Sequence, residues 1–345
     1  AVTMELLYYY ALAHQDSFDV RWIKSKSIAE HLFAPLSERL QDEHQLQVMG
    51  GTLATALNMS TDTRSVRSIG TRSIATGSRG VIDNVDAVVL AVGAKGMGAL
   101  MANSPECAAL TPELVRAGSL DAIDVVSVRL WLDRTISVAD PANVFSRFSA
   151  LKGAGATFFM LDQLQHDTKQ ALWGDQPVQG SVIASDFYNA SAIAELSDQE
   201  VVDCLMQDLL PMAQPAFRGA VVVDQEVRRY LRSVSLFSPG SFGQRPPLET
   251  SLAPVVCAGD WVRMGEREHG AKGLCQERAY VSGLEAGNSL LRRGIVKGSN
   301  ASSGQQHPVF PIRADEPQVV LGRALNKLVM DPIESLGIQW PWLSS

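Results

Sequence analysis

Residues 254–293 constrain the fold more than any other part of the chain, because they read as a strand, a loop and a helix in that order. The apolar run PVVCAGDWVR (254–263) predicts a strand that stops at Gly259 and Asp260. A helix is predicted over 274–293, with small residues at spacings of three and four. These are Ala279, Ser282, Gly283, Ala286 and Gly287. Such a helix can lie close against a sheet or another backbone, which is typical of an α/β sheet.

A second apolar run predicts another strand of the same sheet. VDAVVLAV (85–92) is continuously apolar and ends at Gly93, so we expect a strand that is buried on both faces. Gly93, Gly96 and Gly98 then loosen the chain before a helical segment, 97–103. A proline-containing loop is expected over 104–112.

The stretch 120–252 has a different pattern, with several strands and one clear helix. The helix is predicted over 197–210, where Ser197 and Glu200 have the spacing of a capping box. Strands are predicted over 125–132, 156–161, 180–187 and 220–230. We therefore expect a mostly antiparallel sheet domain inserted between elements of the first domain. The fold class is α/β, or α+β overall.

The rest of the chain completes this division. A helix is predicted over 27–41, with Ser27 and Glu30 at its start, and a short strand over 46–49. The Ser/Thr/Arg-rich stretch 58–80 predicts exposed strands and turns, and a last helix is expected over 317–330. The predicted domains are a partial first domain, an inserted domain, a returning strand and helix, and a linker with a helical tail. Their boundaries are 1–119, 120–252, 253–293 and 294–345.

Composition excludes several classes of function. The net charge of −7, with no basic stripe, argues against a nucleic-acid partner. The four cysteines show no CxxC spacing, so neither a zinc site nor a disulfide framework is expected. No apolar run approaches the length that spans a bilayer, and AVTMELLYYY has no basic region typical of a targeting segment.

The site candidates follow from the first segment. The carboxylate of Asp260, directly after a strand and a glycine, can accept hydrogen bonds from the hydroxyls of a sugar or ribitol. The alternative is an ordinary strand–loop–helix unit, in which Asp260 caps a turn and the small residues only pack. The residues alone leave both readings open.

The segment resembles the C-terminal FAD motif of the flavin amine oxidase and carotenoid desaturase superfamily. The motif is carried by Ala258-Gly259-Asp260 and by Gln276-Glu277-Arg278-Ala279, which continues to Ser282-Gly283. The resemblance implies that Asp260 contacts the ribitol–pyrophosphate region of FAD and that Glu277–Ala279 lie beside the flavin ring. Arg278 replaces a family glycine, and the charged loop 261–275 is longer than usual. His269 in that loop is a weak catalytic candidate.

Wider similarity extends over residues 15–293 and is closest to zeta-carotene-desaturase-like proteins, with Gly93 in a cofactor-flanking position. It implies an incomplete Rossmann-like FAD domain, because the chain has no GxGxxG motif. The chain therefore looks like a C-terminal fragment, which we expect to bind FAD weakly or not at all and to be inactive alone. The resemblance places the protein in a plastid or at a cyanobacterial thylakoid surface.

The implied reaction is desaturation of a lipophilic, carotenoid-like polyene by hydride transfer to FAD, with a quinone as a candidate acceptor. Apolar residues of the inserted domain are candidates for a substrate tunnel. They are Trp131, Phe158, Phe159, Met160, Leu161, Phe187 and Tyr188. The alternatives are an amine or porphyrinogen oxidase, or a non-catalytic carotenoid-binding or assembly protein. The tail helix offers a peripheral membrane contact, although packing onto the main domain is the simpler use of its apolar face.

Overall fold

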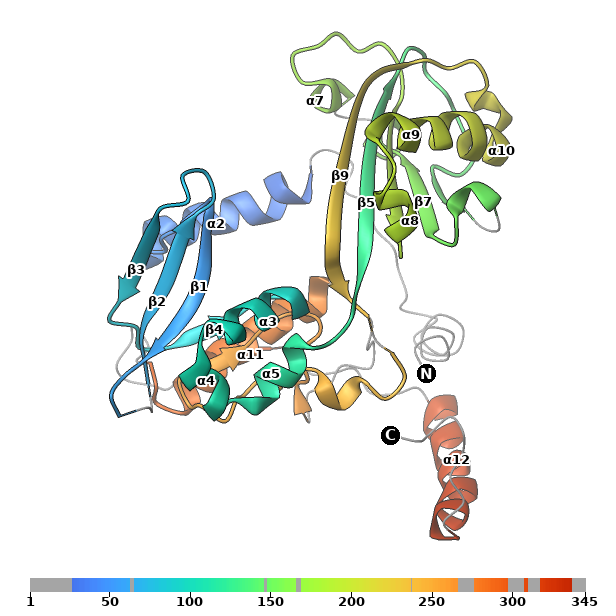
Figure 1. Cartoon of the computed structure of the whole chain (residues 1–345). Helices are drawn as coiled ribbons and strands as arrows, with labels where there is room; N and C mark the ends of the chain where they lie inside the picture. The colour runs from blue at the N-terminus through green and yellow to red at the C-terminus, as the bar shows by residue number, and fades with distance from the viewer. Residues whose placement is uncertain are drawn as a thin grey trace. The chain divides into compact units, whose positions relative to one another are not determined.

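The computed structural model describes residues 27–62, 65–145, 148–165, 169–236, 238–265, 276–296, 307–309 and 317–336. The described chain divides into two compact units. The first unit contains 51–121 and the described residues from 235 onwards, and the second contains 27–50 and 122–234. The predicted mixed α/β class, with antiparallel sheets, is confirmed (Figure 1).

Two sheets form the framework of the first unit. Strands β1 (Thr52–Met59), β2 (Val66–Ser73) and β3 (Arg79–Asp83) form an antiparallel sheet in that order. Strands β4 (Val88–Leu90) and β10 (Val255–Cys257) pair in parallel. The apolar runs at 85–92 and 254–263 therefore meet, as expected for one α/β sheet.

Burial of β4 differs from the sequence-based prediction. Val88 and Leu90 are buried, but Val89 between them is 45% exposed. Val89 is in register with Val256, which packs against helix α11 (Gln276–Arg292), but among the described residues this cover does not extend over Val89. The prediction of a strand buried on both faces is wrong for this part of the chain.

Three helices follow β4: α3 (Ala94–Ala102), α4 (Pro105–Leu110) and α5 (Pro112–Gly118). The helix thus starts earlier than predicted, and Gly96 and Gly98 lie inside it. The expected loop 104–112 contains helix α4 and the start of α5, because a proline is tolerated in the first turn of a helix. Helices α3 and α5 approach so closely at Gly98 and Gly118 that a Cβ added to Gly118 would lie 2.6 Å from the Gly98 Cα.

Helix α11 (Gln276–Arg292) covers the face of β10 that carries Val256. Val256 and Ala258 pack against Ala286 and Leu290 in a small apolar cluster, whereas Val255 and Cys257 belong to the larger core of the unit. Ser282 and Ala286 are buried as the small-residue pattern predicts. The pattern is misleading at Gly283 and Gly287, because a Cβ added at either position would have no atom within 4 Å.

The second unit is a five-stranded sheet with most of its helices on one face (Figure 1). Helix α7 (Lys169–Trp173) lies on the other face, where the Trp131 indole N–H donates to the Leu172 carbonyl over 2.8 Å. Its strand order is β6-β7-β8-β5-β9, and the β6–β7, β7–β8 and β5–β8 pairs are antiparallel. The strands are β5 (Ala122–Leu132), β6 (Ala142–Phe145), β7 (Gly155–Met160), β8 (Val182–Tyr188) and β9 (Val222–Ser235). The four strands predicted for this stretch are present, and β6 is an additional one.

The helices of the second unit are short. They are α6 (Leu161–Leu164), α7 (Lys169–Trp173), α8 (Ser191–Ala194), α9 (Asp198–Asp203) and α10 (Leu210–Ala213), with the π-helix η6 (Cys204–Leu209) between the last two. Three-residue 3₁₀ turns complete the connections at η4 (Ser149–Leu151), η7 (Pro215–Phe217) and, in the first unit, η8 (Phe242–Gln244). The predicted helix 197–210 thus corresponds to α9, η6 and the first residue of α10.

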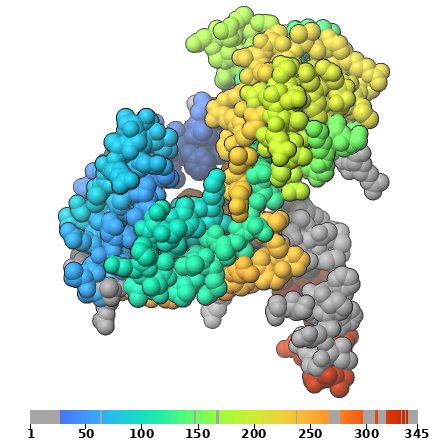
Figure 2. Space-filling view, viewed as in Figure 1, coloured from blue at the N-terminus to red at the C-terminus, as the bar shows by residue number. Residues whose placement is uncertain are grey.

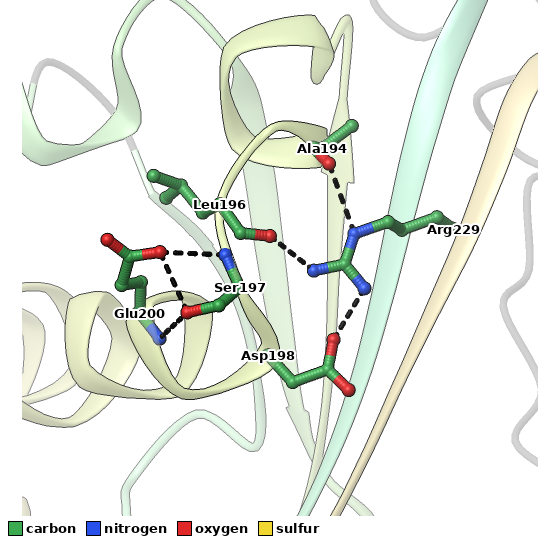
Figure 3. A network of polar contacts seen from close by, with 6 residues as sticks. All are labelled: Ala194, Leu196, Ser197, Asp198, Glu200 and Arg229. Carbon is green, nitrogen blue, oxygen red and sulfur yellow. Dashed lines mark hydrogen bonds and ion pairs between the residues drawn. The ribbon is translucent and has the colours of Figure 1, made fainter.

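The start of α9 is fixed by the predicted capping box (Figure 3). The Glu200 N–H donates to Ser197 Oγ over 3.3 Å, and the Ser197 N–H donates to the Glu200 carboxylate over 2.8 Å. Arg229 of β9 donates to the carbonyls of Ala194 and Leu196 and pairs with Asp198. Arg229 therefore joins the edge strand to the α8–α9 connection.

Three predictions near the ends of the chain need correction. They are the strand over 46–49, the end of the tail helix and the end of the helix over 27–41. Residues 46–49 form no strand, and the tail helix α12 (Pro317–Ser335) continues through Pro332. Of its described apolar side chains, Val319 is buried, whereas Leu321, Leu325 and Leu328 are exposed. The N-terminal helix begins with a Ser27–Glu30 capping contact and runs as the π-helix η3 (Ala29–Phe33) into α2 (Ala34–His44), with Pro35 in the first turn of α2.

Candidate functional site

The candidate site lies at the carboxyl edge of the two parallel strands. Val255, Val256 and Cys257 are in register with Val88, Val89 and Leu90, and the Ala258 N–H donates to the Leu90 carbonyl over 3.1 Å. Gly93 therefore leaves this edge after β4, and Gly259 leaves it after β10. Ligands of α/β sheets bind outside the carboxyl ends of the strands, so the structure brings these predicted residues to a suitable edge.

Gly259 makes the turn that presents Asp260. Its φ of +131° lies in a region that residues with side chains rarely adopt, and an added Cβ would lie 3.1 Å from Cδ1 of Trp261. The Gly259 N–H donates to Ser282 Oγ over 2.8 Å, and the Ser282 hydroxyl donates to the Ala279 carbonyl over 2.8 Å. The serine thus links the end of β10 to the first turns of α11.

Two buried arginines hold the loop that follows. The side chain of Arg278 is 1% exposed, and it donates through Nε to the Asp260 carbonyl and through Nη2 to the Val262 carbonyl, both over 2.6 Å. Arg245, which is 3% exposed, donates through Nε to the Trp261 carbonyl over 2.6 Å and through Nη2 to the Asp260 carbonyl over 3.2 Å. The backbone of 260–262 is therefore fixed from both sides by cationic donors, which make strong hydrogen bonds.

The Asp260 side chain remains half-buried at this edge. Its carboxylate accepts hydrogen bonds from the backbone N–H groups of Asp260 and Trp261. Burial raises the pKa of the carboxyl above its usual value, although the nearby charges of Arg245 and Arg278 act in the opposite direction. Further hydrogen bonds from a ligand would stabilise the charged form of Asp260.

The structure separates the other predicted residues into three groups. Glu277 is exposed at the start of α11, and the Ala279 carbonyl is used by Ser282. Gly93 is the exposed N-cap of α3 and provides no side-chain cap, so N–H groups of the first turn face outwards from the helix end. His269 and the rest of 266–275 lie outside the described residues. The cofactor-binding roles of these residues stay predictions.

Arg278 has a clear structural role that the sequence did not predict. The motif placed it beside the flavin ring, whereas its guanidinium contacts two backbone carbonyls inside the protein. Arg245 was missed entirely, because it lies in a Pro/Gly/Ser-rich stretch with no periodic pattern. The only signal was an arginine within an otherwise uncharged loop.

The predicted substrate residues do not share one surface. Phe158, Met160 and Phe187 are fully buried in the core beneath the helices of the second unit, so they cannot line a tunnel. Side chains alternate along a strand, and Trp131, Phe159 and Tyr188 lie on the opposite face of the sheet, at least partly exposed. Leu161 begins α6 and is partly buried.

Part of that open face is polar. A depression of about 350 Å³ on it is lined by Ser127, Arg129, Asp186, Glu226 and Arg228, among others. The Ser127 hydroxyl donates to Asp186 over 2.5 Å, and Arg228 pairs with Glu226. The candidate tunnel residues Phe158, Met160 and Phe187 thus belong to the core, and the depression on the open face has a largely polar lining.

Metal-binding clusters and membrane-spanning helices are both absent from the described part of the chain. No group of three or more His, Cys, Asp or Glu side chains there could hold a metal ion. None of the described helices is long and apolar enough to cross a membrane.

Comparisons with known proteins agree with the resemblance carried by residues 254–283. No family model matches the chain. It is 28% identical over 215 residues to a carotenoid phi-ring synthase from Streptomyces griseus, a match that covers 62% of this chain and 38% of that protein. The chain therefore spans well under half the length of this curated relative. The match supports the resemblance to the FAD-dependent amine oxidase and carotenoid desaturase superfamily.

Solved structures give weaker likenesses. A cyclohexylamine oxidase from Brevibacterium oxydans IH-35A matches with a TM-score of 0.45 and 12% identity, covering 74% of this chain and 52% of that chain. An oxidoreductase from Methanosarcina mazei matches with a TM-score of 0.38 and 13% identity, covering 66% and 47%. At TM-scores below 0.5, neither match establishes a shared fold.

Proposed function

We propose that the protein is an FAD-dependent oxidoreductase that introduces double bonds into a lipophilic polyene. The observation that carries the proposal is the edge formed by β4 and β10, where Gly259 and Asp260 follow a buried strand and two buried arginines fix their loop. The 28% identical relative, a carotenoid phi-ring synthase, supports a carotenoid-like substrate.

The residues at this edge fit the sugar and phosphate part of a flavin nucleotide. Gly259 has a backbone conformation that brings the chain close to a ligand without a side chain in between. Asp260 would hold hydroxyl groups, since its half-buried carboxylate accepts hydrogen bonds only from backbone N–H groups within the described part of the chain. The first turn of α3 after Gly93 would direct N–H groups and the positive end of its dipole towards phosphate oxygens.

A bound flavin supplies a ring that accepts a hydride, and the protein supplies binding and orientation. Arg245 and Arg278 would keep the backbone of 260–262 in place, so that Asp260 meets the ligand without reorganisation. The lipophilic substrate and a quinone acceptor are further parts of the proposal. Because the depression beside Arg129 and Asp186 is polar, the apolar contacts of a polyene would have to come from outside it.

The test measures FAD binding and then turnover. FAD is titrated into the chain and its fluorescence change is followed for the wild type, Asp260→Ala and Asp86→Ala. Asp86 is an exposed aspartate just before the same strand pair, at its amino end, and serves as the matched control. We expect weak binding, roughly tenfold weaker again for Asp260→Ala and unchanged for Asp86→Ala. Equal FAD affinity of the two variants would contradict the proposed site.

Turnover identifies the substrate class. Because we expect the chain to be inactive alone, the assay uses the whole protein that contains it. This protein is incubated with FAD, a quinone and candidate carotenes, and the products are examined for longer conjugation by their absorbance. A parallel series replaces the carotenes with amines or porphyrinogens. Longer polyenes support the proposal, whereas flavin reduction by an amine or porphyrinogen alone would replace it with the oxidase alternative.

A further inference from the structure

A positively charged groove lies in the first unit, between the antiparallel sheet and α3. It has a volume of about 840 Å³, and residues of β1, β2, β3 and α3 line it, together with Val92. Figure 2 shows this face of the unit, with the blue strands beside the teal helices. The described lining contains two arginines, Arg72 and Arg79, and no acidic residue, although the whole chain carries a net charge of −7.

The two arginines are placed directly opposite each other. Residues 74–78 connect β2 to β3, and the register of the hairpin pairs Arg72 with Arg79. Like charges in this arrangement destabilise a strand pair. Both side chains are exposed, and none of the acidic side chains in the described ranges forms an ion pair with either of them. An anion between them would convert this repulsion into two attractive contacts.

The remaining described lining is mostly apolar or lacks side chains, with uncharged polar groups at Thr52, Thr55 and Asn103. Leu53, 44% exposed, lies opposite Arg72 on β1, so Leu53, Arg72 and Arg79 form one row across the sheet. On the helix side, Val92 and Leu100 contribute apolar surface, and Gly96 leaves the wall flat between them. A ligand that fits such walls has an anionic group at one end and an apolar or planar body.

We propose that this groove binds a phosphate or diphosphate group carried on an apolar or planar organic body, with Arg72 and Arg79 as the residues that hold the anion. Arginine suits this role because its planar donors match phosphate oxygens in pairs. Val92 immediately precedes Gly93, so the groove extends to the carboxyl edge of β4. The phosphates can therefore belong to the flavin nucleotide itself or to a separate phosphorylated molecule.

Calorimetric titration of the chain with inorganic pyrophosphate and with ADP tests the anion site directly, without any turnover. Arg72→Ala and Arg79→Ala should each weaken binding roughly tenfold, and the double variant should abolish it. Arg67→Ala is the matched control, because Arg67 is an exposed arginine on β2 that does not line the groove. Removal of mutually repelling charges should leave the fold intact, which circular dichroism of each variant checks.

The proposal is overturned if the wild type binds neither compound, or if Arg67→Ala weakens binding as much as the groove variants. A second titration adds pyrophosphate to protein saturated with FAD. Competition assigns the groove to the phosphates of the flavin nucleotide, whereas independent binding assigns it to a separate ligand, and both uphold the anion site. A failure of the anion site can be distinguished from a failure of the proposed oxidoreductase function, because that function is tested by Asp260→Ala and by turnover.

Discussion

Replacing Arg278 with methionine tests whether this buried arginine holds the loop after β10. Methionine keeps the apolar stem but removes two donors, leaving the Asp260 and Val262 carbonyls without the bonds that Arg278 makes to them. A hydrogen bond from a charged group contributes about 1.5–3 kcal/mol, so two contribute about 3–6 kcal/mol. Relief from burying a cation offsets part of this, and we expect a net loss of about 3 kcal/mol in local stability.

The readout is hydrogen exchange of the amides in 258–263, followed by mass spectrometry, because exchange reports the free energy of local opening. A loss of about 3 kcal/mol corresponds to roughly hundredfold faster exchange. Arg292→Met is the control on the same helix. Arg292 is 46% exposed and makes a surface ion pair with Glu249, so its removal should cost below about 1 kcal/mol. Equal exchange rates in the wild type and Arg278→Met would refute the reasoning.

Three other substitutions are expected to change the free energy of unfolding, one lowering it, one raising it and one acting with pH. Gly118→Ala places a Cβ 2.6 Å from the Gly98 Cα, and we expect a loss of about 1–3 kcal/mol in urea unfolding. Gly283→Ala adds a Cβ with no atom within 4 Å inside α11 and should stabilise by about 0.5–1 kcal/mol, so a loss there would contradict the packing described. For Asp260, the raised folded-state pKa favours the protonated form, so stability falls as pH rises from about 4 through that pKa. As pH rises towards neutrality, the urea concentration at the unfolding midpoint should therefore increase for Asp260→Asn relative to the wild type. A difference between the two midpoints that does not change with pH would contradict this prediction.

Much of the fold follows from local patterns in the sequence. The four strands of the inserted sheet could be predicted because their apolar residues alternate or run continuously between turn residues. The capping box at Ser197 marked the start of α9, since its contacts involve only neighbouring residues. The parallel pairing of β4 with β10 was implied by two buried-type strands far apart in sequence.

Other features could not be predicted because they depend on what lies nearby in space. Val89 resembles a buried strand residue in every local respect, yet within the described chain the helix that covers Val256 on the neighbouring strand leaves Val89 exposed. Gly283 looks like a close-packing residue, yet nothing lies against it. For the candidate site, Gly259 and Asp260 were predicted from the motif, whereas the contacts of Arg245 and Arg278 needed the folded loop.

The Arg72–Arg79 pair shows a signal that could have been found. In TRSIATGSRG, the two arginines flank a turn symmetrically, so hairpin geometry alone predicts that they face each other. The composition of 58–80 indicated only exposed strands and turns. The hairpin register, and not the composition, predicts that the two arginine charges face each other.

The two-stranded sheet also bears on how the protein behaves in concentrated solution. The second side of β10 is bridged, because Val256 pairs with Glu249 and the Cys257 N–H donates to the Leu248 carbonyl. Strand β4 has a sheet partner on one side only among the described residues, and Val89 adds apolar surface to it. An extended strand with free N–H and C=O groups is a template onto which a strand of another molecule can add. We therefore expect the purified chain to form aggregates whose amount rises with protein concentration. A charged replacement at Val89 should suppress them, because charges on an edge strand oppose such pairing.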